Sequence, residues 1–222
     1  MPRYMIHACP ERLWYVEEFL IPSLTAQGIE REDIRAWNDE RRMGNLIACM
    51  DAFLSLAPSD GGTWHLQDDV IVCRDFAERT AKHDEGVVCG YCFEEFGPDI
   101  RKTGRQPAKY MWNSFPCIRI PDRIAVECAA WVYSDAQYRP EYDRWIKTRR
   151  HDDGFWHDFY EERYPEGTAL NLTPCLVDHV DWLIGGPVAN RWRDHKCRSA
   201  YWEDEELVRD LERRIRERQR GR

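Results

Sequence analysis

The stretch Thr63-Trp64-His65-Leu66-Gln67-Asp68-Asp69 decides the fold prediction, because a short apolar run ends there on two adjacent carboxylates. A run of this length between turn residues is typical of a buried strand. In open α/β sheets, ligands bind beyond the carboxyl ends of the strands. We therefore predict a strand over residues 63–67, with a binding site directly after it.

The first half of the chain alternates short apolar runs with helix-like patterns. Besides the run at 63–67, the pattern predicts strands at 4–8, 34–37 and 86–92, the second of them closing on Asn38-Asp39. Hydrophobic residues at helical spacing predict helices from residue 11 onward, over 44–56 and over 74–83. Strands that alternate with helices in this way are typical of a mainly parallel sheet.

The second half is less regular. Residues 97–109 are polar and rich in Gly, Pro and Arg, which predicts a loop, and residues 170–180 return to apolar strand or irregular structure. Helices are predicted at 124–133, 139–150, 153–164 and 203–222. The last is acidic first and arginine-rich last, as the helix dipole favours. We expect one domain over residues 1–200 and a charged helical tail over 201–222.

Composition narrows the class of protein. The chain has 222 residues, 43% of them hydrophobic, which suits one α/β domain. A formal charge of −8 argues against a protein that binds nucleic acid over its whole surface. Neither a membrane-spanning run nor a signal peptide is visible, so we expect a cytoplasmic protein. The nine cysteines are scattered, which predicts reduced core residues, and Cys89-Gly90-Tyr91-Cys92 lacks the second pair that structural zinc needs.

Two acidic pairs and one histidine are candidates for chemistry. Adjacent carboxylates such as Asp68-Asp69 disfavour joint ionisation when buried, and a bound Mg²⁺ or Mn²⁺ removes that penalty. The alternative is an ordinary acidic turn. Asp152-Asp153 opens a helix, where a plain cap is the alternative. His179 lies in the apolar segment 174–180, where a core histidine is the alternative.

A basic turn precedes the helix predicted at 44–56. Arg41 and Arg42 stand before Gly44-Asn45, and cationic side chains beside the free N–H groups of a helix start suit a phosphate. The alternative is a solvated basic turn.

Taken in order, these segments resemble the GT-A class of glycosyltransferases, which bind a nucleotide-diphosphate sugar on a Rossmann-like sheet. The resemblance implies an α/β fold with a mixed central sheet flanked by helices in a single domain. The matching segments are Ile6-His7-Ala8-Cys9-Pro10-Glu11-Arg12, Asn38-Asp39, Gly44-Asn45, His65-Leu66-Gln67-Asp68-Asp69-Val70, Asp152-Asp153 and Leu176-Val177-Asp178-His179.

The resemblance also implies roles for individual residues. Gln67 replaces the first acid of the family's DxD motif, so Asp69 is the expected ligand of Mn²⁺ or Mg²⁺, with His179 completing the metal shell. Asp153 or Asp152 is the expected base toward the acceptor hydroxyl. The expected donor contacts are His7, Ala8, Arg12, Asn38, Asp39, Arg42, Asn45 and Asp68. Trp112, Phe115 and Trp156 are candidates for stacking on the acceptor, or else core residues.

The expected activity is transfer of a sugar to an acceptor hydroxyl, with inversion favoured by such a base. Segments 112–116 and 174–186 also resemble small bacteriophage-encoded glycosyltransferase-like proteins, which would place the chain in the host cytoplasm. The acceptor stays open between a hydroxymethylated pyrimidine in phage DNA, a protein and a saccharide.

Two alternative functions remain. A nucleotidyltransferase would carry a glycine-rich loop with a lysine where His7-Ala8-Cys9-Pro10 stands, and a non-catalytic phage binding or structural protein would keep the fold with a degenerate site.

Overall fold

A seven-stranded sheet lies at the centre of the chain in the computed structural model, which describes residues 3–40, 49–52, 61–91, 104–108, 116–134, 152–185 and 202–221. Its strand order is β2-β1-β3-β7-β5-β8-β6. The strands are β1 (Arg3–Ala8), β2 (Ile34–Asn38), β3 (Gly62–Gln67), β5 (Val87–Cys89), β6 (Arg105–Pro107), β7 (Cys117–Pro121) and β8 (Thr168–Asn171).

The sheet is parallel in its first part and mixed in the rest. Strand β1 pairs in parallel with both β2 and β3, as the alternation of runs and helices predicts. Strand β7 then runs antiparallel to β3 and β5, and β6 runs antiparallel to β8. The predicted mixed α/β sheet is therefore confirmed at this level.

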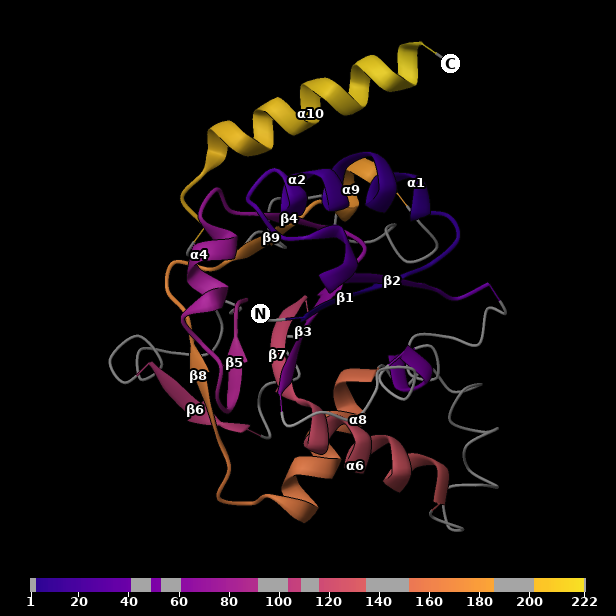
Figure 1. The fold of residues 1–222 in the computed structure, drawn as a ribbon. Coiled ribbons are helices and arrows are strands. Elements are labelled where there is room, and N and C mark those ends of the chain that lie inside the picture. The colour runs from indigo at the N-terminus through magenta and orange to yellow at the C-terminus, as the bar shows by residue number, and fades with distance from the viewer. Residues whose placement is uncertain are drawn as a thin grey trace.

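Helices cover both faces of the sheet (Figure 1). One layer holds α1, η1, α2 and α10, and α6 and α8 lie on the opposite side. The helices are α1 (Leu13–Tyr15), the π-helix η1 (Val16–Leu20), α2 (Ile21–Thr25), the 3₁₀-helix η2 (Arg31–Asp33), α4 (Phe76–Ala81), α6 (Asp122–Ser134), α8 (Asp152–Arg163), α9 (Asp181–Ile184) and α10 (Glu205–Arg220).

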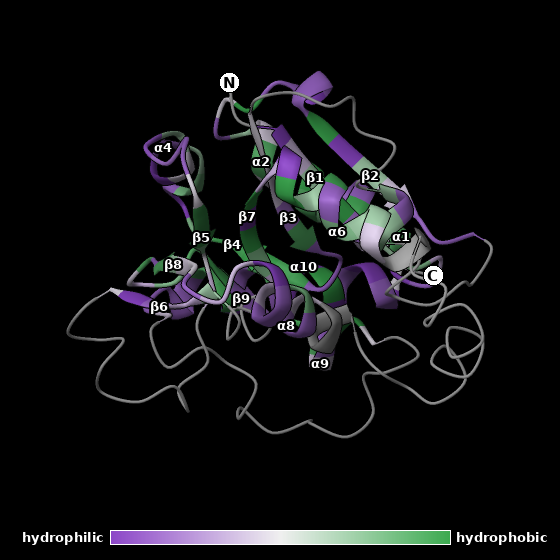
Figure 2. Ribbon diagram, turned by 90° about the horizontal axis from the view of Figure 1, so that it is seen from below, coloured by the Kyte–Doolittle hydropathy of each residue, from purple (hydrophilic) through white to green (hydrophobic). Residues whose placement is uncertain are grey.

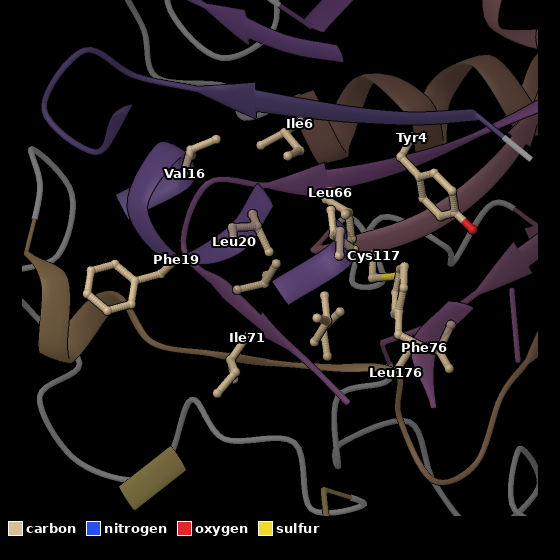
Figure 3. Close-up of a cluster of buried hydrophobic side chains, with 14 of the residues drawn as sticks. Tyr4, Ile6, Val16, Phe19, Leu20, Leu66, Ile71, Phe76, Cys117 and Leu176 are labelled. Carbon is tan, nitrogen blue, oxygen red and sulfur yellow. The ribbon is translucent and has the colours of Figure 1, made fainter. Parts of the chain in front are cut away.

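Alternation along the strands divides the core into two clusters, because successive side chains of a strand point to opposite faces. Ile6 and Leu66 pack with Val16 and Leu20 of η1 in the first cluster, shown in Figure 3. Met5 packs in the second cluster, with residues of β7, α6 and α8. Figure 2 shows a hydrophobic strand β5 inside the sheet and a hydrophilic strand β6 at its edge, as expected where an edge meets water.

A separate two-stranded sheet joins distant parts of the sequence. It consists of β4 (Val70–Val72) and β9 (Val177–His179), which run antiparallel, with Val70 opposite His179. Strand β4 begins directly after Asp68-Asp69. This pairing therefore brings His179 to the carboxyl end of β3.

One side of the C-terminal helix α10 packs into the hydrophobic core, and the other side faces solvent. Its residues Val208, Leu211 and Ile215 are buried in the first cluster, while arginines and acids fill its other side. Asp204 accepts a hydrogen bond from the Leu207 amide and so caps the helix start. The predicted helix at 203–222 is confirmed, and its buried stripe anchors it over η1.

Several element predictions needed correction. Strand β7 was not predicted, and β6 lies inside the predicted loop 97–109. Of the helix predicted at 44–56, residues 49–52 are helical and the rest lie outside the described residues, as does the helix predicted at 139–150. Within the described part, no helix is long and apolar enough to cross a membrane.

Candidate metal and donor site

The two acidic residues after β3 lie at the carboxyl end of the parallel strands. Asp68 and Asp69 form the turn from β3 to β4, and Arg12 follows the end of the neighbouring strand β1. The amide of Arg12 donates to the Cys9 carbonyl at 3.1 Å, which closes a turn after β1. Parallel pairing of β1 with β3 thus places these turns side by side.

Arg12 bridges the two carboxylates. Its Nη1 lies 3.0 Å from Asp68 Oδ1 and 2.7 Å from Asp69 Oδ2, and its Nε donates to the Gly185 carbonyl at 2.8 Å. The side chain is largely enclosed, with Arg12 8% exposed. Burial opposes its charge, but Asp69 and Asp68 outweigh that effect and raise the Arg12 pKa. Arg12 therefore supplies the positive charge that stabilises two neighbouring buried carboxylates.

The two carboxyls respond differently to this environment. Burial, and then repulsion from Asp69, raises the pKa of Asp68, although its Oδ2 accepts a hydrogen bond of 2.7 Å from the Cys9 amide. Burial also opposes ionisation of Asp69, but His179 and Arg12 outweigh it and lower the Asp69 pKa to about 2. Asp69 is thus the more readily ionised acid of the pair.

His179 meets Asp69 across the small sheet. Its Nδ1 lies 3.4 Å from Asp69 Oδ1, and the Val180 amide donates to the Asp69 carbonyl at 2.7 Å, which fixes the two backbones. The Tyr91 ring packs edge-on against the imidazole, with centroids 5.2 Å apart. Burial would lower the His179 pKa, but the charge of Asp69 reverses this and raises it.

The donor atoms at this point suit a divalent cation. Asp69 Oδ1 is buried and accepts no hydrogen bond from any residue that the structure describes, while it faces the imidazole nitrogen of His179. One carboxylate oxygen and one imidazole nitrogen suit Mn²⁺ better than Mg²⁺, because Mg²⁺ prefers oxygen ligands. Arg12 takes the other Asp69 oxygen, so described residues offer two protein ligands, and substrate oxygens or water would complete the shell.

The expected donor contacts at the ends of β1 and β2 lie near one another. The Asp39 amide donates to the Ala8 carbonyl at 2.9 Å. A cavity of about 470 Å³ lies beside β2 and is lined by Asn38, Trp37 and Arg35 among others. Asn38 Oδ1 is buried with no hydrogen-bond partner among the described residues.

Other predicted site residues lie elsewhere. His7 sits on the face of the sheet that Met5 shares, opposite Ala8, because strand side chains alternate. Trp156 is fully buried against Phe159 and Tyr160, an environment that favours its core alternative over acceptor stacking.

The remaining predictions meet the limits of the described structure. Asp152 and Asp153 begin α8, which packs against α6, and their side chains are not described. Arg42, Asn45, Trp112 and Phe115 lie outside the described residues.

The structure adds contacts that the sequence did not indicate. Arg12 was expected to meet a diphosphate, whereas its guanidinium holds Asp68, Asp69 and the Gly185 carbonyl. Its position four residues after a strand was the available signal, since that turn lies beside the next parallel strand. Among known proteins, no family model matches the chain, and no curated protein matches it.

Proposed function

We propose that this chain is a metal-dependent glycosyltransferase that takes its sugar from a nucleotide-diphosphate donor. The observation that carries the proposal is the approach of His179 Nδ1 to within 3.4 Å of Asp69 Oδ1. These two residues were paired as metal ligands by the GT-A resemblance, and they come from distant segments. An acidic turn with no function would not require a histidine beside it.

The position of the pair in the sheet supports the proposal. Asp69 follows β3, and Arg12 follows β1, so both lie at the carboxyl ends of parallel strands. This is the edge at which open α/β sheets bind ligands. A mixed sheet covered by helices is also the architecture that the resemblance implies.

Each residue of the cluster has a separate task in this proposal. Asp69 and His179 hold the divalent cation, which when bound neutralises charge on the leaving diphosphate. Arg12 is a positioning residue, because it fixes both carboxylates from a buried site. Asp68 is held by the Cys9 amide and orients the turn next to the donor.

The cavity beside β2 suits the nucleoside part of the donor. Trp37 offers an aromatic surface and Asn38 offers hydrogen-bonding groups. The charged residues that line the cavity are Arg31, Arg35, Glu17 and Glu40. Asp153 or Asp152 at the start of α8 remains the proposed base toward the acceptor. The acceptor class is still open between modified DNA, protein and saccharide.

One observation favours a second candidate, a non-catalytic protein with a purely structural charge cluster. Arg12 already balances much of the charge of Asp68 and Asp69 without a metal. A cluster satisfied in this way can serve stability alone. The two candidates differ in whether Mn²⁺ and a nucleotide bind together.

A thermal-shift panel tests the proposal. UDP-, GDP-, ADP- and CDP-sugars, and the four nucleoside triphosphates, are added to the full chain with and without Mn²⁺. We expect one diphosphate sugar to raise the melting temperature only when Mn²⁺ is present, and Asp69→Asn and His179→Ala to abolish that shift. Asp75→Asn is the matched control, since Asp75 is an exposed acid beyond the other end of β4, with 57% of its side chain accessible.

The possible outcomes separate the candidates. A Mn²⁺-dependent shift with a diphosphate sugar, followed by sugar transfer in an acceptor screen, supports the proposal. A shift with triphosphates alone supports the nucleotidyltransferase rival. A flat panel from a wild-type chain that melts cooperatively contradicts both enzymes and supports the structural cluster.

A further inference from the structure

Three metal-binding side chains meet on the face of the sheet that carries Met5. They are His7 of β1, His65 of β3 and Cys49 of the helical residues 49–52, and one ligand atom from each lies within 4.8 Å of the others. His65 and Cys49 are completely buried, and His7 is 8% exposed. Within the described part of the chain this is the one group of three such residues found close enough to share an ion.

Strand pairing fixes the two histidines relative to each other. Met5 of β1 lies opposite His65 of β3, and Met5 and His7 share a face because they are two residues apart. The imidazoles are therefore diagonal neighbours on one face, with ring centroids 6.0 Å apart and planes inclined by 50°. Both are held by a paired backbone, so little ordering would be needed to bring them to a shared ion.

The chemistry of the three groups selects the class of metal. Imidazole nitrogen and thiolate sulfur are ligands for zinc, whereas magnesium and calcium take oxygen. Ligand atoms around tetrahedral zinc lie roughly 3.4–3.6 Å apart, from Zn–N and Zn–S lengths of about 2.1 and 2.3 Å. The observed limit of 4.8 Å therefore calls for side-chain movement of about 1 Å.

The surroundings of the three side chains are largely apolar. Cys49, Met5 and Ile118 belong to the second hydrophobic cluster, so the site has an apolar wall. Three protein ligands leave a fourth position for water or another ligand, as in zinc sites that are open to substrate.

A cavity lies beside strand and helix neighbours of the three side chains. The cavity of about 470 Å³ beside β2 is lined by Met5, Trp37 and Ala52. Trp37 is the register partner of His7 on β2, and Ala52 lies one helical turn after Cys49. Of the three proposed ligands, His7 is the most exposed to solvent.

We infer that His7, Cys49 and His65 form a zinc-binding site, which shares no residue with the Asp69–His179 centre. In this assignment His7 is a zinc ligand, not the donor contact that the family resemblance implied. The site binds the ion by three ligands from three segments, so it ties residues 49–52 to the middle of the sheet. It does not depend on the proposed glycosyl transfer.

Zinc and cobalt binding by the full chain tests this inference. The protein is stripped with a chelator under reducing conditions, titrated with Zn²⁺ against a competing indicator, and titrated separately with Co²⁺. We expect one Zn²⁺ per chain, and a Co²⁺ spectrum with d–d bands of a tetrahedral site and a near-ultraviolet thiolate-to-cobalt band. Binding should release the thiol proton, so affinity should rise with pH.

Matched variants identify the ligands. Cys49→Ser should weaken Zn²⁺ binding at least about 100-fold, because loss of a ligand exceeds the 10–100-fold effect of an outer partner. Cys128→Ser is the control, since Cys128 is a fully buried thiol of the same hydrophobic cluster but not of the trio. If Cys49→Ser does not fold, His7→Gln gives the same reading from a ligand nearer to solvent.

The results either support or overturn the assignment. Loss of the ion and of the thiolate-to-cobalt band in Cys49→Ser or His7→Gln, with retention in Cys128→Ser, supports it. No stoichiometric Zn²⁺ in the wild type, equal affinity in the ligand variants, or a Co²⁺ spectrum without a thiolate band would overturn it. None of these results bears on Mn²⁺ at Asp69, so the two proposals fail independently.

Discussion

Replacing Arg12 with methionine tests how much the positive charge of Arg12 stabilises the buried acidic pair. Methionine keeps much of the length of the side chain but removes the cation that lies 3.0 Å from Asp68 and 2.7 Å from Asp69. The two acids are 6% and 8% exposed, so they would face each other with little help from water. The hydrogen bond to the Gly185 carbonyl is lost as well.

The expected cost follows from this burial. Removing one partner of a buried ion pair costs about 3–5 kcal/mol. In a domain of this size, 1 kcal/mol moves the melting temperature by about 2–4 °C, so Arg12→Met should melt about 6–20 °C lower. The pKa of Asp68 is already raised by burial and by Asp69, and Arg12 opposes that rise. The deficit should therefore shrink as the pH falls and Asp68 takes up a proton.

Calorimetry and urea denaturation of four proteins provide the assay. Arg12→Met/Asp68→Asn should recover much of the loss, because a single carboxylate beside His179 remains. Arg74→Met is the control, since Arg74 is an exposed arginine paired with Asp204 and should leave the melting temperature nearly unchanged. Mn²⁺ should stabilise Arg12→Met more than the wild type, because two carboxylates are released to the ion. Wild-type stability in Arg12→Met, or no recovery in the double variant, would show that Arg12 does not stabilise the acidic pair.

The remaining predictions concern packing, backbone and pH. Ile215→Ala should cost about 2–5 kcal/mol in urea denaturation, because Ile215 of α10 is fully buried; a loss below 1 kcal/mol would mean that α10 is not anchored. Gly28→Ala should cost roughly 1–2 kcal/mol, because φ is +85° there although no atom lies within 4 Å of an added Cβ; an unchanged midpoint would argue against that conformation. Burial raises the pKa of Tyr4 to about 12, so the folded chain favours the neutral phenol, and this stability is present below pH 10 and lost toward pH 12. Tyr4→Phe should therefore lose less stability than the wild type between those pH values, and equal losses would contradict the assignment.

The sequence predicted the elements whose signals are local. Strands β1, β2 and β3 each read as a run of suitable length, and β3 ends on the acids that were expected to matter. The parallel pairing followed from the helices between them. The placement of Asp69 at the carboxyl end of the sheet was therefore predictable.

Elements that depend on tertiary partners could not be predicted. Strand β7 carries Arg119, which is buried because it donates to the carbonyls of Asp84 and Gly86, partners that no local pattern reveals. Strand β6 is Arg105-Gln106-Pro107 and has no apolar run at all, so only its pairing with β8 defines it. Likewise, the contact between His7 and His65 could be predicted only from the register in which β1 pairs with β3.

The charge cluster shows the same division. That Asp69 and His179 could share a metal followed from a family resemblance, but their approach depends on the antiparallel pairing of β4 with β9. The bridging role of Arg12 was missed, because its guanidinium reaches Asp68 and Asp69 only when two turns lie side by side. Local sequence indicated the groups, and strand pairing determined their partners.

The most direct test of the metal centre is the electron paramagnetic resonance signal of free Mn²⁺ during titration into the chain, with each nucleoside diphosphate present in turn. We predict that the wild type removes one Mn²⁺ per chain from solution with at least one diphosphate, and that His179→Ala binds it at least about tenfold more weakly. Asp69→Asn should bind none at that position while remaining folded by circular dichroism. Equal Mn²⁺ uptake by the wild type and both folded variants would show that Asp69 and His179 do not hold the ion.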